Sequence, residues 1–422
     1  MERRFEVRKE ALLGECQVAP AVFRDVLPRL ERFMRPYVEM LIRSEQREHA
    51  GTYVSGLLSD VKRKNVESIA YRHDQHRMGL QRFIGHATWN DAPLRMELAR
   101  QVGTELGEAD GVIVFDPSGF PKKGNASACV QRQWCGRLGK VDNCQVGVYM
   151  GYVSSQEHAL VDMRLYVPRE WAKDKTRRKL VGMPKEIRHQ TRHALCLQML
   201  GEKGHLLPHR WVAGDDEMGR VYHFRRDLQL LGEQYLLAVP SNTLIRDLDA
   251  DPPEYQGKGQ PRKRPWRRVE TWRKALPEQS WTRVDVRDGE KGPLQVQIVK
   301  RRVAGRTERH CEAPAETLIV IRRTSEDGTI EHDYYISNAA YETPLREFAR
   351  VAKAEHRIEE CIQRGKSETG LADYEVRTFR GWHHHQTLSL IASWFLVCEA
   401  RRGKTNGHRQ SPFHRSAKAS RC

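Results

Sequence analysis

Carboxylates follow short apolar stretches at two places in the sequence. Residues 111–115, Gly-Val-Ile-Val-Phe, lead into Asp116, and residues 210–214, Arg-Trp-Val-Ala-Gly, lead into Asp215 and Asp216. A short apolar run bounded by turn-forming residues is typical of a buried strand. Each carboxylate is therefore predicted to stand at or near the end of a strand. Carboxylate oxygens are preferred ligands of Mg²⁺ in proteins, so these positions predict metal ligands.

Turn-forming and basic residues follow the first carboxylate. Residues 117–121, Pro-Ser-Gly-Phe-Pro, are expected to end the strand directly after Asp116. Lys122 and Lys123 come next. A pair of Lys residues beside a metal ligand indicates contact with phosphate.

A third carboxylate is predicted on a long helix near the C-terminus. Thr343 is expected to cap this helix and Pro344 to occupy its first turn. Glu359 and Lys366 lie two turns apart on one face of it, a spacing that suits a metal and a neighbouring phosphate but also an exposed polar face. Cleavage of a phosphodiester commonly uses two metal ions ~3.5–4 Å apart. Carboxylates from two strands and one crossing helix are suited to such a site.

The middle of the chain predicts the order in which strands and helices follow one another. Strands are expected over 111–116, 144–154 and 158–167, then a helix over 184–200, a strand over 210–214, helical residues through 231 and a strand over 235–239. Three strands that pair antiparallel, followed by alternating helix and strand, are the arrangement of the ribonuclease H-like fold. The predicted class is α/β, with a mixed sheet and flanking helices.

Five regions are predicted along the chain. Residues 1–105 form a helical DNA-binding region, 106–240 the first part of the catalytic core and 241–340 a basic, β-rich insertion. Residues 341–400 complete the core with the Glu-bearing helix and a C-terminal helix, and residues 401–422 form a disordered basic tail.

The charge of the chain predicts a polyanionic partner. The formal net charge is +17, spread over the whole length, and nucleic acid is the usual partner of so basic a protein. The insertion contains a basic loop whose predicted DNA-binding residues are Arg262, Lys263, Arg264, Trp266, Arg267 and Arg268. Trp272 and Trp281 either stack on bases with Trp266 or pack the insertion itself.

Several other functional classes are excluded. No apolar run is long enough to span a membrane, and residues 1–5 lack the core of a signal peptide, so a cytoplasmic protein is expected. The nine Cys residues contain no Cys-x-x-Cys pair, and no glycine-rich nucleotide-binding loop occurs. Residues 383–385, three consecutive His, cannot all face one ion on a helix and are expected to contact phosphate or solvent.

The combined pattern resembles the DDE-type transposases of bacterial insertion sequences. The parts that carry the resemblance are Val114-Phe115-Asp116 followed by Lys-Lys-Gly, Trp211-Val212-Ala213-Gly214-Asp215 with Gly219, Arg357-Ile358-Glu359-Glu360 with Lys366, and residues 53–58, 63–65 and 374–377. The resemblance implies that Asp116, Asp215 and Glu359 hold two Mg²⁺ or Mn²⁺ ions. It also implies that Arg357 and Lys366 contact DNA.

Such a transposase would bind the terminal inverted repeats of its element and cleave DNA there. It would then join the 3′-hydroxyl ends to target DNA, as a homodimer assembled on paired ends and associated with the bacterial nucleoid. Two alternatives are a ribonuclease H-like nuclease that cuts without joining, and a catalytically inactive descendant that only binds DNA.

Two choices of ligand stay open. Asp216 is an alternative to Asp215, whose spacing to Gly219 favours it, and Glu375 is an alternative to Glu359.

The sequence also departs from the related signature, which has a Tyr seven residues and an Arg four residues before the Glu. This chain has Ala352 and Glu355 there. The corresponding phosphate contacts would fall to Arg350, Lys353 or Arg357.

Overall fold

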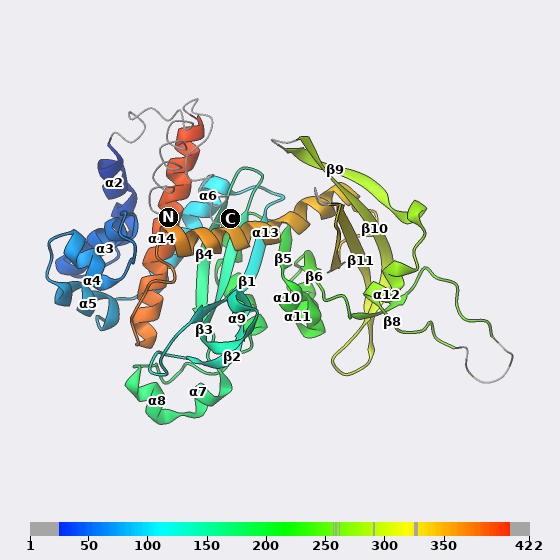
Figure 1. Ribbon diagram of the computed structural model, residues 1–422, viewed down its shortest axis with the longest axis horizontal. Helices are drawn as coiled ribbons and strands as arrows, with labels where there is room; N and C mark the ends of the chain where they lie inside the picture. Colours follow the sequence, from blue (N-terminus) through cyan, green and yellow to red (C-terminus); the bar gives the residue numbers. More distant parts are fainter. Residues whose placement is uncertain are drawn as a thin grey trace.

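A mixed sheet runs through the molecule and carries helices along its length (Figure 1). The computed structural model describes residues 25–405 except 256, 258–259, 261, 290–291 and 325–327. Within these residues the sheet has twelve strands in the order β2-β3-β1-β5-β6-β12-β11-β10-β7-β8, while β4 pairs with β3 and β9 with β10.

The core part of the sheet has the predicted arrangement. Its strands are β1 (Val112–Pro121), β3 (Lys140–Val153), β4 (His158–Leu165), β5 (Trp211–Gly214) and β6 (Tyr235–Ala238). The first three pair antiparallel, and β5 and β6 add parallel to β1. The order β4-β3-β1-β5-β6 confirms the ribonuclease H-like α/β prediction. A short strand, β2 (Gln131–Cys135), pairs with the beginning of β3.

β1 is longer than predicted. It does not end at Asp116 but continues to Pro121, paired with β3 throughout. Its parallel pairing with β5 stops at Phe115 and Gly214. Beyond that point β1 has an open side, and a proline, which lacks the N–H donor, is tolerated at such an edge. The predicted turn over 117–121 is therefore wrong, but Asp116 does stand where the parallel ladder ends.

The insertion is continuous with the core sheet (Figure 1). Its elements are β7 (Leu244–Asp247), β8 (Arg267–Arg268), α12 (Val269–Lys274), β9 (Thr282–Gly289), β10 (Gly292–Arg306), β11 (Glu312–Thr324) and β12 (Ile330–Ser337). β12 pairs antiparallel with β6 and so joins the two parts. Trp272 is buried and donates from Nε1 to Asp247 at 2.8 Å, and the Arg322 guanidinium lies 4.4 Å from the ring centre of Trp281. These two Trp residues pack the insertion.

Helices flank the core sheet and form the described part of the N-terminal region. They are α2 (Val26–Val38), α3 (Ser44–Leu57), α4 (Val66–Arg72), α5 (Arg77–Gly85), α6 (Ala92–Leu106), α7 (Arg169–Lys173), α8 (Lys175–Leu180), α9 (Arg192–Lys203), α10 (Asp216–Arg220), α11 (Tyr222–Leu230), α13 (Leu345–Glu368) and α14 (Phe379–Thr405), with single 3₁₀ turns at Gly136–Leu138, Gly204–Leu206 and Glu278–Ser280. Within the described ranges, no helix combines the length and apolar character that crossing a membrane requires.

Three helix boundaries differ from prediction. α9 begins at Arg192 rather than near residue 184, because the Thr191 side chain caps it by accepting the Ala194 N–H at 3.1 Å. α13 begins at Leu345 without a side-chain cap, so the predicted Thr343 cap is wrong. α14 extends to Thr405, beyond residue 400 where the C-terminal helix was predicted to end. Residues 406–422 and 1–24 lie outside the described residues.

Histidines on α14 join the N-terminal helices to the core. At most 9% of each side chain in 383–385 is exposed. The His384 ring nitrogens lie 3.0 and 2.9 Å from the carbonyl oxygens of Ile84 and Trp89. His385 lies 2.9 Å from the Tyr53 hydroxyl. Burial lowers the pKa of His385 to about 3 and keeps its ring neutral. The predicted contact of these histidines with phosphate or solvent is therefore wrong.

A buried charge network fastens α6 and α9 to β4. The Asp162 carboxylate is fully buried and pairs with Arg95, with Lys203 at 2.7 Å and with Arg164 at 2.8 Å. Burial opposes ionisation of this carboxyl, but the surrounding cations outweigh it and hold the pKa of Asp162 well below its ordinary value.

Replacing Asp162 by Ala is expected to destabilise the fold by roughly 3–5 kcal/mol, because Arg95 and Lys203 would remain buried without their counter-charge. Urea unfolding followed by circular dichroism would measure this loss. Asp142→Ala is the control, since Asp142 pairs with a largely exposed Lys140 and its loss should destabilise the fold much less. Equal losses in the two variants would contradict the role given to the network.

Candidate active site

Asp116 and Asp215 lie side by side at the end of the parallel ladder. Phe115 pairs with Gly214 in the last step of the β1–β5 ladder, and the two Asp residues are the next in each chain. Neighbouring strands are ~4.7–4.9 Å apart. Both side chains are partly buried. The placement brings together two carboxylates that lie far apart in the sequence.

Local packing selects Asp215 over its neighbour. Asp215 is the N-cap of α10, and its Oδ1 accepts the Met218 N–H at 3.1 Å. A Cβ on Gly219 would stand 1.9 Å from the Ala238 carbonyl oxygen, so only glycine allows α10 to lie this close to β6. Asp216 is exposed and pairs with Arg220 at 3.4 Å. The geometry therefore favours Asp215 as the partner of Asp116.

The helix α13 crosses the core strands and brings Glu359 towards Asp116. α13 packs against β1, β3, β4 and β5. A Cβ on Gly151 of β3 would lie 2.8 Å from the Ile358 Cδ1, so the missing side chain lets the helix approach the sheet closely. Glu359 is the next residue and is close enough to raise the pKa of Asp116.

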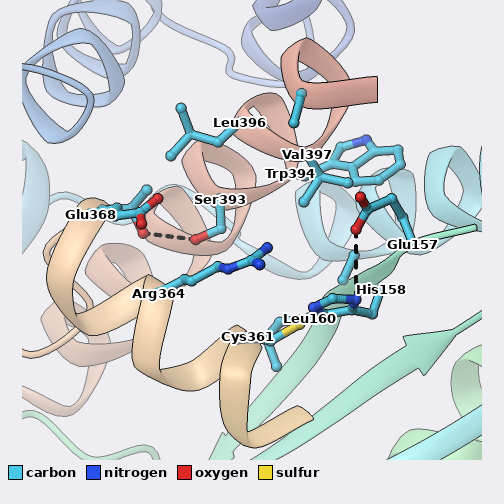
Figure 2. A pocket seen from close by; sticks show the side chains of 13 residues that line it. Glu157, His158, Leu160, Cys361, Arg364, Glu368, Ser393, Trp394, Leu396 and Val397 are labelled. Carbon is cyan, nitrogen blue, oxygen red and sulfur yellow. Dashed lines mark hydrogen bonds and ion pairs between the residues drawn. The ribbon is translucent and has the colours of Figure 1, made fainter. Parts of the chain in front are cut away.

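The neighbouring acid, Glu360, belongs to a different network. It pairs with Arg357 at 3.1 Å, with Arg364, and with His158 at 3.5 Å. A cavity of about 40 Å³ lies beside this network, between β4, α13 and α14. Figure 2 shows His158 and Arg364 among the side chains that line it. Glu360 pairs with two Arg side chains, whereas Glu359 is 66% exposed and lies 3.8 Å from His356, so Glu359 is the better candidate for the third acid.

The pKa values of Asp116 and Asp215 are raised by burial and by neighbouring carboxylates. Burial raises the pKa of Asp116 well above its ordinary value, the Asp215 and Glu359 carboxylates raise it further, and the Lys366 ammonium opposes them. Burial, together with Glu217, raises the pKa of Asp215 to about 7. Such shifts arise when carboxylates lie close together with too little positive charge between them.

Lys366 on α13 contacts β1 two residues after Asp116. Its Nζ donates to the Ser118 Oγ at 2.7 Å and lies 5.1 Å from the ring centre of Phe120. Lys366, which was predicted to share one face of this helix with Glu359, thus contacts β1.

The other predicted residues near the acids have separate surroundings. The Nζ of Lys122 donates to the Tyr374 carbonyl at 3.2 Å and lies 3.5 Å from the centre of the Tyr374 ring. Burial lowers the pKa of Lys122 to about 8. Lys123 is exposed. Glu375, the alternative third acid, accepts from the Asn65 Nδ2 at 3.0 Å and lies 3.9 Å from Arg63. Glu375 thus faces the N-terminal helices.

The predicted basic loop lies in the insertion, and its members differ in their surroundings. Arg262, Arg267 and Arg268 are exposed. Three others contact the insertion itself: Lys263 pairs with Glu312 at 3.3 Å, Arg264 donates to the Ala250 carbonyl at 2.8 Å, and Trp266 lies 4.2 Å below the Arg246 guanidinium.

One acid of the site, Glu355, is not among the predicted ligands. It lies one helical turn before Glu359 on α13. Burial raises the pKa of Glu355 to about 9, and the carboxylates of Asp215, Glu359 and Asp333 raise it in the same direction. The i, i+4 spacing of Glu355 and Glu359 could have indicated a second carboxylate on this helix face.

The donor chemistry of the site fits a hard divalent cation. All of its acids offer carboxylate oxygens, the ligands that Mg²⁺ and Mn²⁺ prefer, and their mutual repulsion calls for positive charge. In the part of the chain that the structure describes, no three His, Cys, Asp or Glu side chains lie in an arrangement that could hold a metal ion.

The sequence match now decides the family. Residues 36–293 match the family model described as "DDE superfamily endonuclease". The chain belongs to this family. The matched range contains both Asp116 and Asp215 and ends before α13. The family match thus does not reach Glu359, and its role as the third acid stays a prediction.

Two further similarities extend the comparison. A protein of Microchaete diplosiphon described as "Probable transposase for insertion sequence element IS701" is 32% identical over 200 residues, which are 46% of this chain and 49% of the relative. The match thus spans about half of that relative. A cryo-EM structure of a piggyBac transposase synaptic complex with hairpin DNA aligns over 92% of this chain and 75% of its own, with 9% identity and a TM-score of 0.43.

Replacing Asp215 by Asn is expected to stabilise the metal-free endonuclease at neutral pH. The folded-state pKa of about 7 lies above the ordinary Asp value, so ionisation of Asp215 opposes folding. The stability of the wild type relative to the variant should be greatest below pH 4 and fall as pH rises to about 7. The difference above pH 7 is at most a few kcal/mol.

Thermal unfolding in EDTA between pH 4 and pH 8.5 would measure this difference. Asp216→Asn is the control, because Asp216 is the neighbouring acid and is exposed. A constant difference between Asp215→Asn and wild type across this range would contradict the prediction.

Proposed function

We propose that this DDE endonuclease is the transposase of an insertion sequence. It binds the terminal inverted repeats of the element, cleaves DNA there and joins the 3′-hydroxyl ends to target DNA. The observation that carries the proposal is the meeting of Asp116 and Asp215 at the end of one parallel ladder, with Glu359 supplied by a helix across it. The family match and the named relative support the same activity.

Asp116, Asp215 and Glu359 would hold two Mg²⁺ or Mn²⁺ ions. When bound, these ions would polarise the scissile phosphate and supply a hydroxide or an activated 3′-hydroxyl at neutral pH. Lys366 would give up its bond to Ser118 and hold a non-bridging phosphate oxygen as a point charge. Asp215 keeps its orientation through the Met218 N–H, which leaves one carboxylate oxygen for a ligand.

DNA would be held mainly by the basic surface outside the acids. The net charge of +17 favours attraction to the phosphate backbone. In this proposal residues 1–105 and the insertion contact the element ends, through Arg267 and Arg268 and through Lys122, Lys123 and Arg357 nearer the core. Two copies would assemble on paired ends.

The acids are expected to be required for chemistry but not for DNA binding. Asp116→Asn, Asp215→Asn and Glu359→Gln should each lower the rate of end cleavage by on the order of a thousandfold or more, because each removes a ligand that supports several kcal/mol of transition-state stabilisation. Gel-based cleavage of element-end DNA with Mg²⁺ would measure the rates.

Matched neighbours provide the controls. Asp216→Asn and Glu375→Gln should keep cleavage within a fewfold of wild type, since Asp216 pairs with Arg220 and Glu375 faces the N-terminal helices. Loss of activity in either control would reassign the corresponding ligand. If wild type and Asp116→Asn cleave equally, the protein is a DNA-binding descendant without catalytic function.

Strand transfer separates a transposase from a nuclease. With pre-cleaved ends that carry a free 3′-hydroxyl, wild type should give products covalently joined to a target plasmid. Cleavage without joined products would establish the nuclease alternative.

The exposed arginines of the insertion are expected to bind phosphate rather than read sequence. Arg267→Ala combined with Arg268→Ala should weaken binding to element-end and unrelated DNA by a similar factor. The slope of log K against log salt should fall by about 0.9 for each lost contact. Fluorescence anisotropy at several salt concentrations would test this. The control Arg220→Ala removes an exposed charge outside the insertion, and an equal effect there would contradict the assignment.

A further inference from the structure

Residues 169–188, which join β4 to α9 and contain α7 and α8, concentrate positive charge. They include eight Lys and Arg residues and three Asp and Glu residues, a net charge of +5 in a chain whose total is +17. We infer that this stretch, the α7–α8 segment, binds the phosphate backbone of duplex DNA away from the acids. The inference rests on the proposed function, because it places a part of the DNA on which the proposed chemistry acts.

Two arginines of the α7–α8 segment hold its own backbone in place. The Arg177 guanidinium lies 3.8 Å from the ring centre of the buried Trp171 and donates to the Val130 carbonyl at 3.1 Å. Arg178 donates to the Pro184 carbonyl at 2.7 Å. Because these internal contacts fix the segment, its other cations are displayed on a defined surface.

The remaining six cations of the segment are exposed. They are Arg169, Lys173, Lys175, Lys179, Lys185 and Arg188. Among the described residues, none of the six forms an ion pair with a carboxylate, so their charge is available to an external anion. A second copy of this chain would bring the same positive charge and be repelled, which favours a polyanion such as DNA as the partner.

The segment is attached to the strands that lead away from the active site. The Trp171 Nε1 donates to the Val130 carbonyl at 2.8 Å, and Val130 directly precedes β2. In β3, Cys144 pairs with Gln131 of β2 on one side and with Pro121, the last residue of β1, on the other. The segment therefore lies at the end of the sheet towards which β1 continues beyond its carboxylate (Figure 1).

The distance between the acids and this end of the sheet corresponds to several base pairs. Pro121 is five residues beyond Asp116 in β1, or ~17 Å at about 3.4 Å per residue. Each strand of B-form DNA carries one phosphate per about 3.4 Å. A duplex that follows β1 would thus meet the segment about five base pairs or more from the scissile bond. Lys123, Arg132 and Trp134 are exposed at the same end of the sheet and extend the surface.

Binding of DNA duplexes of different lengths to the full chain tests the inference. The test variant combines Lys175→Gln with Lys179→Gln, which are exposed and one turn apart on α8. It should bind long duplexes about tenfold more weakly than wild type, and the slope of log K against log salt should fall by about 0.9 for each lost contact. Element-end and unrelated DNA should be affected alike, because phosphate contacts carry no sequence information.

The control variant removes two charges from the opposite end of the sheet. It combines Arg210→Gln with Arg346→Gln, both exposed. Arg210 directly precedes β5, and Glu347, which follows Arg346, accepts from the Nε1 of Trp211 at the start of β5 at 2.7 Å. The control should bind DNA as wild type does. Both variants should also unfold at the wild-type temperature in circular dichroism, because the replaced side chains are exposed.

Shortening the duplex separates a local contact from a general effect of charge. Element-end duplexes would be shortened in two series, one from the element side and one from the flanking side, with affinity measured by fluorescence anisotropy. One series should remove the difference between the test variant and wild type once fewer than about five base pairs remain beyond the scissile bond. That series identifies which side of the cut the segment holds.

Three results would overturn the inference. They are a difference that neither series removes, an equal loss of affinity in the control, and wild-type affinity in the test variant. Each of these leaves the proposed function standing, because cleavage and strand transfer are measured separately. Failure of the wild type to bind element-end DNA would overturn both.

Discussion

The parallel pairing of β1 with β5 is the constraint on which the site depends. The two strands are separated in sequence by a hairpin and by α9, and their ladder ends at Phe115 and Gly214. That endpoint places two carboxylates beside each other at a position where β1 continues with a free edge. A change of register by one residue would turn one of the two side chains to the other face of the sheet. The chemistry therefore depends on a backbone ladder that carries no functional side chain itself.

The C-terminal helices hold the rest of the molecule to that ladder. α13 lies close to the sheet because Gly151 leaves room for Ile358. The same helix includes Glu359 and Lys366. α14 then connects the core to the N-terminal helices through His384 and His385, which are bonded to backbone or hydroxyl oxygens. Burial keeps the pKa of His385 low and its ring neutral, so its contact with Tyr53 needs no counter-charge.

The local pattern of the sequence predicted the strands and the two Asp positions, because a buried strand requires apolar residues and its end tolerates a carboxylate. Features that depend on long-range contacts were not predictable in this way. The extension of β1 past Pro117 depends on β3 remaining paired where β5 has ended. The insertion and the core share one sheet because β12 pairs with β6. His384 was predicted to contact phosphate or solvent, because the two carbonyls that its ring contacts lie about 300 residues away in the sequence.

Glu355 illustrates the same limit at the site. In the sequence it occupies the position of a phosphate-binding Arg in the related signature, and its spacing to Glu359 fits an exposed polar helix face equally well. Only the packing of α13 on β5 shows that its neighbours are acids. The protein as a whole carries a net charge of +17, yet these acids collect where the scissile phosphate would have to enter. Without cations they would repel that phosphate, while the net positive charge of the chain would attract the rest of the DNA. In the proposed function, cations held by the acids would therefore be required for the scissile phosphate to approach them.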